Sequence, residues 1–297
     1  MSRQGDIWTV RDVLSWTSQK FAGLQIPTPL LDAQLLIGSV LCLSKVEIYT
    51  QLDRPLLESE RSSLRELVRR RLSGEPVAYL LNQKFWHDLD LHVDSRVLVP
   101  RPETETLLDV VLAICKHESR KPKHILDICT GSGCLAIALA KTFPEATVTG
   151  VDISLDALDV ARLNAERNKV GNIEWRHGDA LDVGTYSGCA SSNFDIIVAN
   201  PPYVSESEWN QCDSTVKEFE PRLALVGGLE GWQMPRRLLD TLRNSGLLDS
   251  AGIVGIELGI SHPEILAAEF GARCGFEFPN PFLSVACQRP VWEFPRN

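Results

Sequence analysis

The stretch HILDICTGSG at residues 124–133 decides the fold of this chain. Its beginning, His124–Ile128, is a short apolar run typical of a buried strand, and an apolar helix is expected just after it, over residues 135–142. Glycines between a strand and a helix let the backbone approach a ligand closely, in front of the helix N-terminus. The stretch therefore predicts a strand–loop–helix unit with a ligand site at the end of the strand.

The same alternation of strand and helix continues along the chain. Alternating units place parallel strands side by side with helices over both faces, so we predict an α/β domain with a mostly parallel sheet. Further helices are expected over residues 103–116, 154–168 and 235–245, and further strands over residues 147–151, 173–175, 196–199 and 252–258.

The residues before this domain follow other patterns. Apolar positions three and four apart recur up to Leu72, which is typical of amphipathic helices, and Gly74 and Pro76 end the last of them. Alternation over residues 85–93 and a second run at 97–99 indicate two short strands. We therefore predict three parts: a helical substrate-recognition domain at 1–76, a connecting β-hairpin at 77–100 and the α/β domain at 101–297.

The composition is that of an ordinary globular protein. The 297 residues are 44% hydrophobic and 23% charged, and no apolar run approaches the ~20 residues of a membrane helix. The eight cysteines form no C-x-x-C pair and have no nearby histidine at zinc-site spacing. We expect reduced thiols, no metal site, no membrane association and a cytoplasmic location.

The charge is unevenly distributed. Residues 1–100 hold 12 basic and 12 acidic residues, so the whole net charge of −9 falls on residues 101–297. An acidic domain repels the phosphate backbone of a duplex. We therefore expect no direct binding to nucleic acid.

Acidic residues narrow the choice of ligand for the glycine-rich loop. Asp152 ends the next strand, 21 residues after Gly131, where an acidic residue commonly binds a ribose diol. The loop matches neither G-x-G-x-x-G nor the Walker pattern, and Asp127 would repel a pyrophosphate but suits a cation. This pattern favours S-adenosylmethionine, which has adenosine and a sulfonium but no phosphate. Asp179, within Gly178–Ala180, is a candidate for the adenine amino group.

A second motif, Asn200-Pro201-Pro202-Tyr203, directly follows the apolar run at residues 194–199. Two prolines end the strand's hydrogen-bond ladder and fix the backbone there. An amide, rigid carbonyls and an aromatic ring can grip a planar NH2 group at its edge and on its face. Because ligands of such sheets bind at the carboxyl ends of the strands, we expect both motifs to form one site.

Together these motifs resemble the class I S-adenosylmethionine-dependent methyltransferases that act on amide or exocyclic nitrogen. Over about residues 31–264 the chain is also similar to the PrmC/HemK family. Five strings carry this similarity: RRLSGEPVAY at 70–79, FW at 85–86, VPRPETE at 99–105, FEPRLAL at 219–225 and GGLEG at 227–231.

The resemblance implies a Rossmann-like methyltransferase domain with a mostly parallel, seven-stranded sheet, joined by the hairpin to the helical bundle. It implies methylation of the side-chain amide nitrogen of the glutamine in the GGQ motif of class 1 peptide chain release factors, which the N-terminal helices would hold. We expect the enzyme to be a monomer. Two departures are Cys129, where many members carry glycine, and Leu283–Asn297, which lacks the family's usual final Asp…Gly…Arg pattern.

Roles for individual residues follow, some from the chemistry of the two motifs and some from the resemblance. In catalysis, the Asn200 side chain and the Pro201 carbonyl accept the two N–H groups of the substrate amide, and Tyr203 packs on its plane. The expected cofactor-binding residues are Asp127, Cys129, Thr130, Gly131, Ser132, Gly133, Asp152, Asp179, Ala180 and Asn200. The expected substrate-binding residues are Asn200, Pro201, Pro202, Tyr203, Arg101 and Glu103.

Three alternatives stay open at this point. A related branch methylates a glutamine of a large-subunit ribosomal protein and often shows the string Asp-x-Cys-Thr-Gly-Ser-Gly-Cys, as residues 127–134 do. Adenine N6 methyltransferases use the same Asn-Pro-Pro-Tyr motif, although the acidic domain argues against nucleic acid. A non-enzymatic S-adenosylmethionine-binding protein would not need Asn200 and Tyr203, which are both present.

Overall fold

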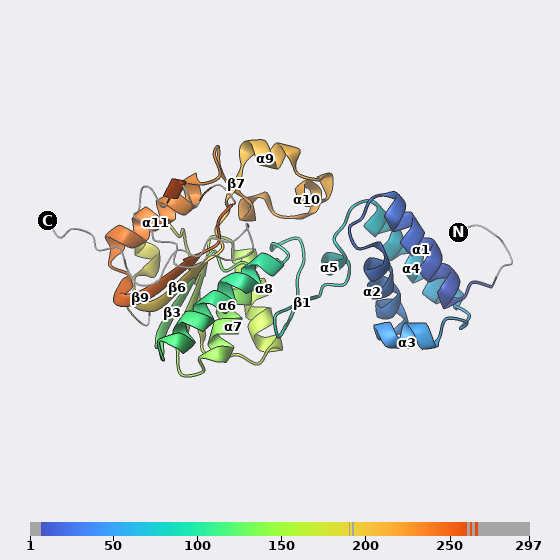
Figure 1. The fold of residues 1–297 in the computed structure, drawn as a ribbon, viewed down its shortest axis with the longest axis horizontal. Helices are drawn as coiled ribbons and strands as arrows, with labels where there is room; N and C mark the ends of the chain where they lie inside the picture. The colour runs from blue at the N-terminus through green and yellow to red at the C-terminus, as the bar shows by residue number, and fades with distance from the viewer. Residues whose placement is uncertain (1–6, 190, 192, 260–261, 263–264, 267–297) are drawn as a thin grey trace. The chain divides into compact units, whose positions relative to one another are not determined.

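The computed structural model describes residues 7–189, 191, 193–259, 262 and 265–266. It divides into two compact units, Met1–Gln83 and Lys84–Asn297 (Figure 1). Within the described ranges, no helix combines the length and the apolar character that crossing a membrane requires.

The first unit is a helical bundle, as predicted. Thr9 caps its first helix in a capping box with Asp12, and a buried ion pair of 2.8 Å between Arg71 and Asp32 joins the fourth helix to the second. Its core contains Phe21 and other fully buried apolar side chains. The helices are α1 (Val10–Gly23), α2 (Pro29–Leu41), α3 (Lys45–Thr50), α4 (Glu58–Leu72) and α5 (Val77–Leu80).

The second unit begins with a hairpin that is shorter than the predicted 77–100: Val77–Leu80 form helix α5 of the first unit, and the second strand of the hairpin lies earlier than predicted. Strand β1 (Lys84–Trp86) pairs with β2 (Leu89–Leu91) in antiparallel fashion. Residues 97–99 are not a strand, because the backbone turns between Asp94 and Val97. The Asp94 carboxylate accepts the Arg96 N–H at 3.0 Å and stabilises that turn.

The central sheet has the predicted parallel character. The strand order is β5-β4-β3-β6-β9, and all four pairings are parallel. Within the described residues this sheet has five strands; the predicted final hairpin falls outside them. The strands are β3 (His124–Ile128), β4 (Thr147–Asp152), β5 (Ile173–His177), β6 (Phe194–Ala199) and β9 (Leu248–Ile256).

Helices cover the sheet on both faces (Figure 1). On one face lie three helices that pack side by side: α6 (Pro102–His117), α7 (Cys134–Thr142) and α8 (Leu155–Arg167). On the other face α11 (Gln233–Ser245) packs against β9 and buries Leu238, Leu239 and Leu242 in a core cluster shared with β3 and β6. Parallel pairing brings the carboxyl ends of β3, β4, β6 and β9 to one edge, where the loops carry the polar residues of interest.

Short elements that the sequence did not predict follow β6. Strand β7 (Val204–Ser205) pairs in parallel with β8 (Val226–Gly228), and two short helices, α9 (Glu206–Gln211) and α10 (Ser214–Phe219), lie between them. Gly227 allows a close backbone approach here, because a Cβ atom on it would overlap the carbonyl oxygen of Pro202. The GGLEG string therefore supports the Asn-Pro-Pro-Tyr turn.

Candidate active site

A cavity of about 750 Å³ opens at the carboxyl edge of the sheet, within the second unit. Its lining includes most residues of the glycine-rich loop, together with Asp152, Asp179, Ala180, Asn200 and Pro202. The structure thus brings the two motifs of the sequence into one site, although they lie about 70 residues apart in the chain.

The glycine-rich loop is built around the Asp127 carboxylate, which is 1% exposed. Its Oδ2 atom accepts hydrogen bonds from the Thr130 hydroxyl at 2.5 Å and from the Ala136 N–H at 3.0 Å. Its Oδ1 atom is buried and has no hydrogen-bond partner among the described residues. Burial raises the pKa of this carboxyl group to about 7.

Three residues of the loop, Cys129, Gly131 and Gly133, have left-handed backbone conformations. Gly133, the N-cap of α7, has φ = 80°, and an added Cβ atom would press on Trp175 at 3.0 Å. Cys129 has φ = 59°, a region that glycine enters without steric cost. This left-handed conformation is a physical reason why a glycine suits position 129. Burial raises the pKa of the Cys129 thiol.

Asp152 contributes to the loop as well as to the cavity wall. Its Oδ2 atom accepts the Gly131 N–H at 2.8 Å, and its Oδ1 atom accepts the Ser154 N–H at 2.9 Å. Burial raises its pKa, although these two backbone donors oppose the shift. The sequence predicted an acidic strand end here but not that it would hold the glycine-rich loop in place.

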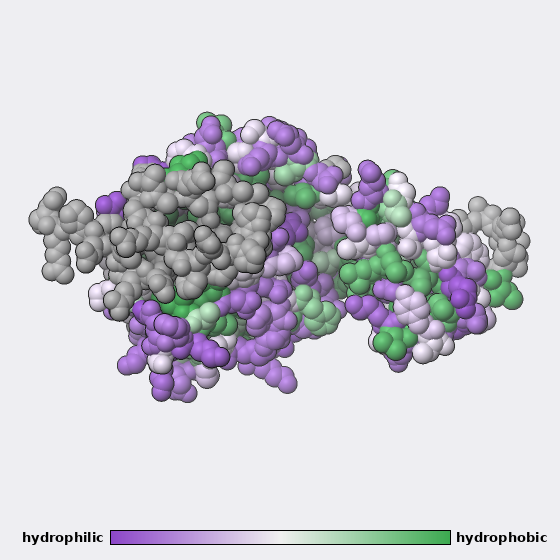
Figure 2. Space-filling model, viewed as in Figure 1, coloured by the Kyte–Doolittle hydropathy of each residue, from purple (hydrophilic) through white to green (hydrophobic). Residues whose placement is uncertain are grey.

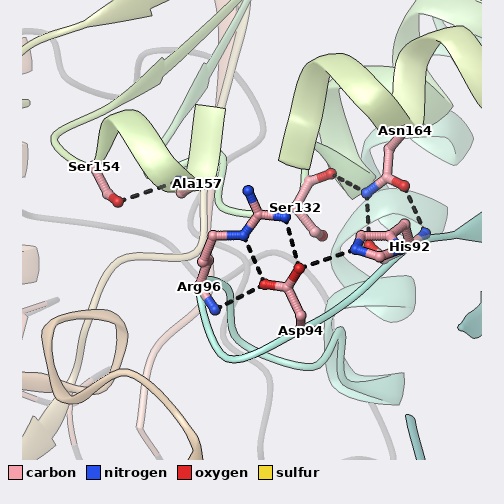
Figure 3. A network of polar contacts seen from close by, with 7 residues as sticks. All are labelled: His92, Asp94, Arg96, Ser132, Ser154, Ala157 and Asn164. Atoms are coloured by element: carbon pink, nitrogen blue, oxygen red, sulfur yellow. Dashed lines mark hydrogen bonds and ion pairs between the residues drawn. The ribbon is translucent and has the colours of Figure 1, made fainter. Parts of the chain in front are cut away.

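Asn164 of α8, which the sequence did not single out, buttresses the same loop from behind (Figure 3). Its Nδ2 group donates to the Ser132 carbonyl at 2.9 Å and to the His92 carbonyl at 3.0 Å, and its Oδ1 atom accepts the His92 N–H at 2.6 Å. The His92 ring contacts Asp94, which pairs with Arg96 at 2.6 Å. Arg96 lines the cavity, so this network links α8 to the cavity wall.

Replacing Asn164 with Ala is expected to lower the free energy of unfolding by about 2 kcal/mol, because it leaves buried backbone groups without partners. Urea unfolding of the full chain measures the change. Glu166→Ala, at an exposed position of the same helix, is the matched control and should stay within about 0.5 kcal/mol of the wild type. Equal losses in the two variants would contradict a structural role for Asn164.

Around Asn200, four polar side chains form a hydrogen-bonded chain. The Asn200 Nδ2 group donates to the Thr104 hydroxyl oxygen at 3.0 Å, and that hydroxyl donates to Oε2 of Glu257 at 2.7 Å. The Tyr203 hydroxyl donates to Oε1 of the same carboxylate at 2.9 Å. Sequence reasoning missed Thr104 and Glu257, although Glu257 directly follows the apolar strand β9, as Asn200 follows β6.

The other expected substrate-binding residues lie in different places. Arg101 lines the cavity and forms an ion pair of 2.6 Å with Glu220. This ion pair joins the VPRPETE string to the FEPRLAL string. Pro202 also lines the cavity, whereas Glu103, Pro201 and Tyr203 are not among the described residues that line it.

The cavity fits S-adenosylmethionine by the chemistry of its walls. The buried Asp127 oxygen, which has no partner in the described part of the chain, suits a cationic group, and Asp152 and Asp179 add acceptors for hydroxyl and amino groups. Glycines and left-handed residues keep the loop backbone close to the ligand. When bound, this cofactor supplies an electrophilic methyl group on its sulfonium.

Comparisons with known proteins agree with this chemistry. Residues 12–81 match the family model of the PrmC N-terminal domain, and residues 104–224 match that of the methyltransferase small domain. The methyltransferase match confirms the expectation of an S-adenosylmethionine-dependent methyltransferase.

Three curated relatives are named release factor glutamine methyltransferase. The protein of Chlorobaculum tepidum is 42% identical over 76% of this chain and 79% of its own length. That of Rhodopirellula baltica is 41% identical over 78% of each chain. That of Geobacter sulfurreducens is 34% identical over 93% of each chain. Identity of this extent, over both units, shows that this chain belongs to the family of release factor glutamine methyltransferases.

Proposed function

We propose that this enzyme transfers the methyl group of S-adenosylmethionine to the side-chain amide nitrogen of the glutamine in the GGQ motif of peptide chain release factors. Membership of the family supports the substrate. The single observation that carries the chemistry is the Asn200 amide at the cavity wall, with its nitrogen bound to Thr104 and its oxygen left as an acceptor.

An amide nitrogen is a weak nucleophile, because its lone pair is delocalised into the carbonyl group. In the proposed mechanism the Asn200 Oδ1 atom and the rigid Pro201 carbonyl accept the two N–H groups of the glutamine amide, and Tyr203 packs on its plane. Two acceptors concentrate electron density on the nitrogen and aim it at the methyl group. Such positioning supplies most of the catalysis, and the proton leaves to water after transfer.

Cofactor binding is assigned to the residues that line the glycine-rich side of the cavity. We propose that Asp127 binds a cationic group of the cofactor, that Asp152 binds the ribose hydroxyls, and that Asp179 and Ala180 border the adenine. The placement of Cys129, Thr130, Gly131 and Ser132 on the same wall supports this assignment.

The first unit is proposed to hold the release factor. Several apolar side chains of α2 and α3 are exposed, among them Leu30 at 45% and Tyr49 at 51%, and a hydrogen bond of 2.7 Å from Gln34 to the Tyr49 hydroxyl oxygen joins the two helices. Figure 2 shows hydrophobic residues at the surface of this unit among hydrophilic ones. Exposed apolar side chains and zero net charge in the first 100 residues suit a protein partner better than nucleic acid.

We further propose that the enzyme works in the cytoplasm, as a monomer. Its proposed substrate acts in translation, and six cysteines within the described part of the chain are free thiols. Analytical ultracentrifugation of the full chain measures the oligomeric state.

Incubation with labelled S-adenosylmethionine tests the function. Label is expected in a release factor but not in its GGQ→GGA variant, because the variant lacks the amide that receives the methyl group. Equal labelling of the variant would overturn the proposal. A large-subunit ribosomal protein and duplex DNA form the other two arms: preferred labelling of either would favour the ribosomal branch or adenine methylation instead.

A further inference from the structure

We propose that Glu257 and Thr104 are positioning residues that fix which end of the Asn200 amide faces the substrate. The inference rests on the proposed role of Asn200 and goes beyond it, because it explains why the amide oxygen, rather than the amide nitrogen, is presented to the cavity.

The pair is held rigidly beside Asn200. Glu257 is 0% exposed and its N–H donates to the Ala199 carbonyl at 2.9 Å, so its backbone is tied to the strand that ends at Asn200. Thr104 is 2% exposed and lies in the first turn of α6. Three elements, α6, β6 and β9, therefore meet at these side chains, and none of the three residues is free to turn without breaking a buried hydrogen bond.

The direction of the hydrogen bonds follows from the chemistry of the groups. An ionised carboxylate accepts hydrogen bonds and donates none, so the Thr104 and Tyr203 hydroxyls must both donate to Glu257. A hydroxyl has a single hydrogen, and that of Thr104 is then used. Its oxygen can only accept, which requires the Nδ2 group of Asn200 on that side and leaves Oδ1 as the acceptor on the other.

Burial is the largest influence on Glu257 and raises its pKa, and the nearby Glu103 acts in the same direction. The hydrogen bonds from Thr104 and Tyr203 and the charge of Arg101 oppose this shift and favour the ionised form. A neutral side chain at position 257 could donate to Thr104 and so reverse the chain of donors. The Thr104 hydroxyl would then point at Asn200, and the amide would turn its nitrogen toward the substrate.

The same carboxylate also holds Tyr203. The tyrosine hydroxyl is bound to Glu257, and its ring meets the edge of His262 with 6.5 Å between ring centroids. A single buried residue thus sets the orientation of both side chains that are proposed to grip the substrate amide.

Three variants test the inference, with transfer to a release factor measured first for the wild type. Thr104→Val removes the hydroxyl at nearly constant shape and is expected to lower kcat about 10- to 100-fold, the size of effect that a misplaced catalytic group produces. Glu257→Gln should lower kcat to a similar extent. Thr104→Ser keeps the hydroxyl and should restore most of the activity, and all three should bind S-adenosylmethionine as the wild type does.

The double variant Thr104→Val/Glu257→Gln distinguishes positioning from general damage. If the two residues act in one chain, the double variant should be no slower than the slower single variant, whereas independent defects would multiply. Multiplying losses, or a Thr104→Val enzyme as fast as the wild type, would overturn the inference. Absence of wild-type transfer to any release factor would instead overturn the proposed function. If one single variant fails to fold, the other still reports on Asn200 through its kcat.

Discussion

Replacing Asn200 with Ala is expected to abolish methyl transfer while leaving the affinity for S-adenosylmethionine within about tenfold of the wild type, or ~1.4 kcal/mol. The side chain supplies the acceptor that orients the substrate amide, and removal of one preorganised polar group of this kind typically costs about 100- to 1,000-fold in kcat. Cofactor affinity should change little, because the glycine-rich loop and Asp152 provide the remaining contacts on the cavity wall.

Single-turnover transfer to a release factor and equilibrium binding of the labelled cofactor measure the two effects separately. Asn210→Ala is the matched control, since Asn210 is an exposed asparagine of α9 outside the cavity lining. The control should behave as the wild type in both assays. Near-normal turnover of the Asn200→Ala enzyme would refute the role of this side chain, whereas loss of cofactor binding would make it a cofactor ligand only.

Much of this site could be predicted because its residues stand at the carboxyl ends of apolar strands. Asp152 ends one run that is long enough to be recognised as a strand, Asn200 directly follows another, and parallel sheets gather their carboxyl ends at one edge. Glu257 directly follows β9, but the sequence did not single it out, because the predicted strand extended to residue 258. Exact strand ends depend on pairing with a neighbour, which a single sequence does not contain.

Other parts of the site depend on contacts between distant segments. Thr104 and Asn164 lie in amphipathic helices, where a polar residue on the buried face has no distinctive local pattern. Their partners are 153 and up to 72 residues away in the chain. Strands β7 and β8 were missed for a related reason: two or three residues are too few to show alternation, and their pairing depends on the glycines of the GGLEG string.

Replacing Asp127 with Asn is expected to weaken binding of S-adenosylmethionine about 10- to 150-fold. The side chain keeps its shape but loses its charge, and hydrogen bonds to charged groups contribute about 1.5–3 kcal/mol. The Oδ1 atom, buried in the cavity wall and without a partner among the described residues, is the acceptor that a cationic group of the cofactor would meet. Asp109→Asn, at an exposed position of α6, makes the same charge change elsewhere and should bind as the wild type does.

The pKa of Asp127 makes this prediction specific to the carboxylate. Burial raises that pKa to about 7, so the neutral form predominates below neutral pH in the free enzyme. A cationic ligand selects the ionised form and lowers the pKa in the complex, so the dissociation constant should rise about tenfold for each pH unit below 7. The dissociation constant should level off about one to two pH units below 7, where Asp127 in the complex also becomes protonated. Isothermal titration between pH 5 and 8 should show this slope for the wild type and Asp109→Asn and none for Asp127→Asn. A slope that persists in Asp127→Asn would assign the pH dependence to another group and leave Asp127 with a structural role in the loop.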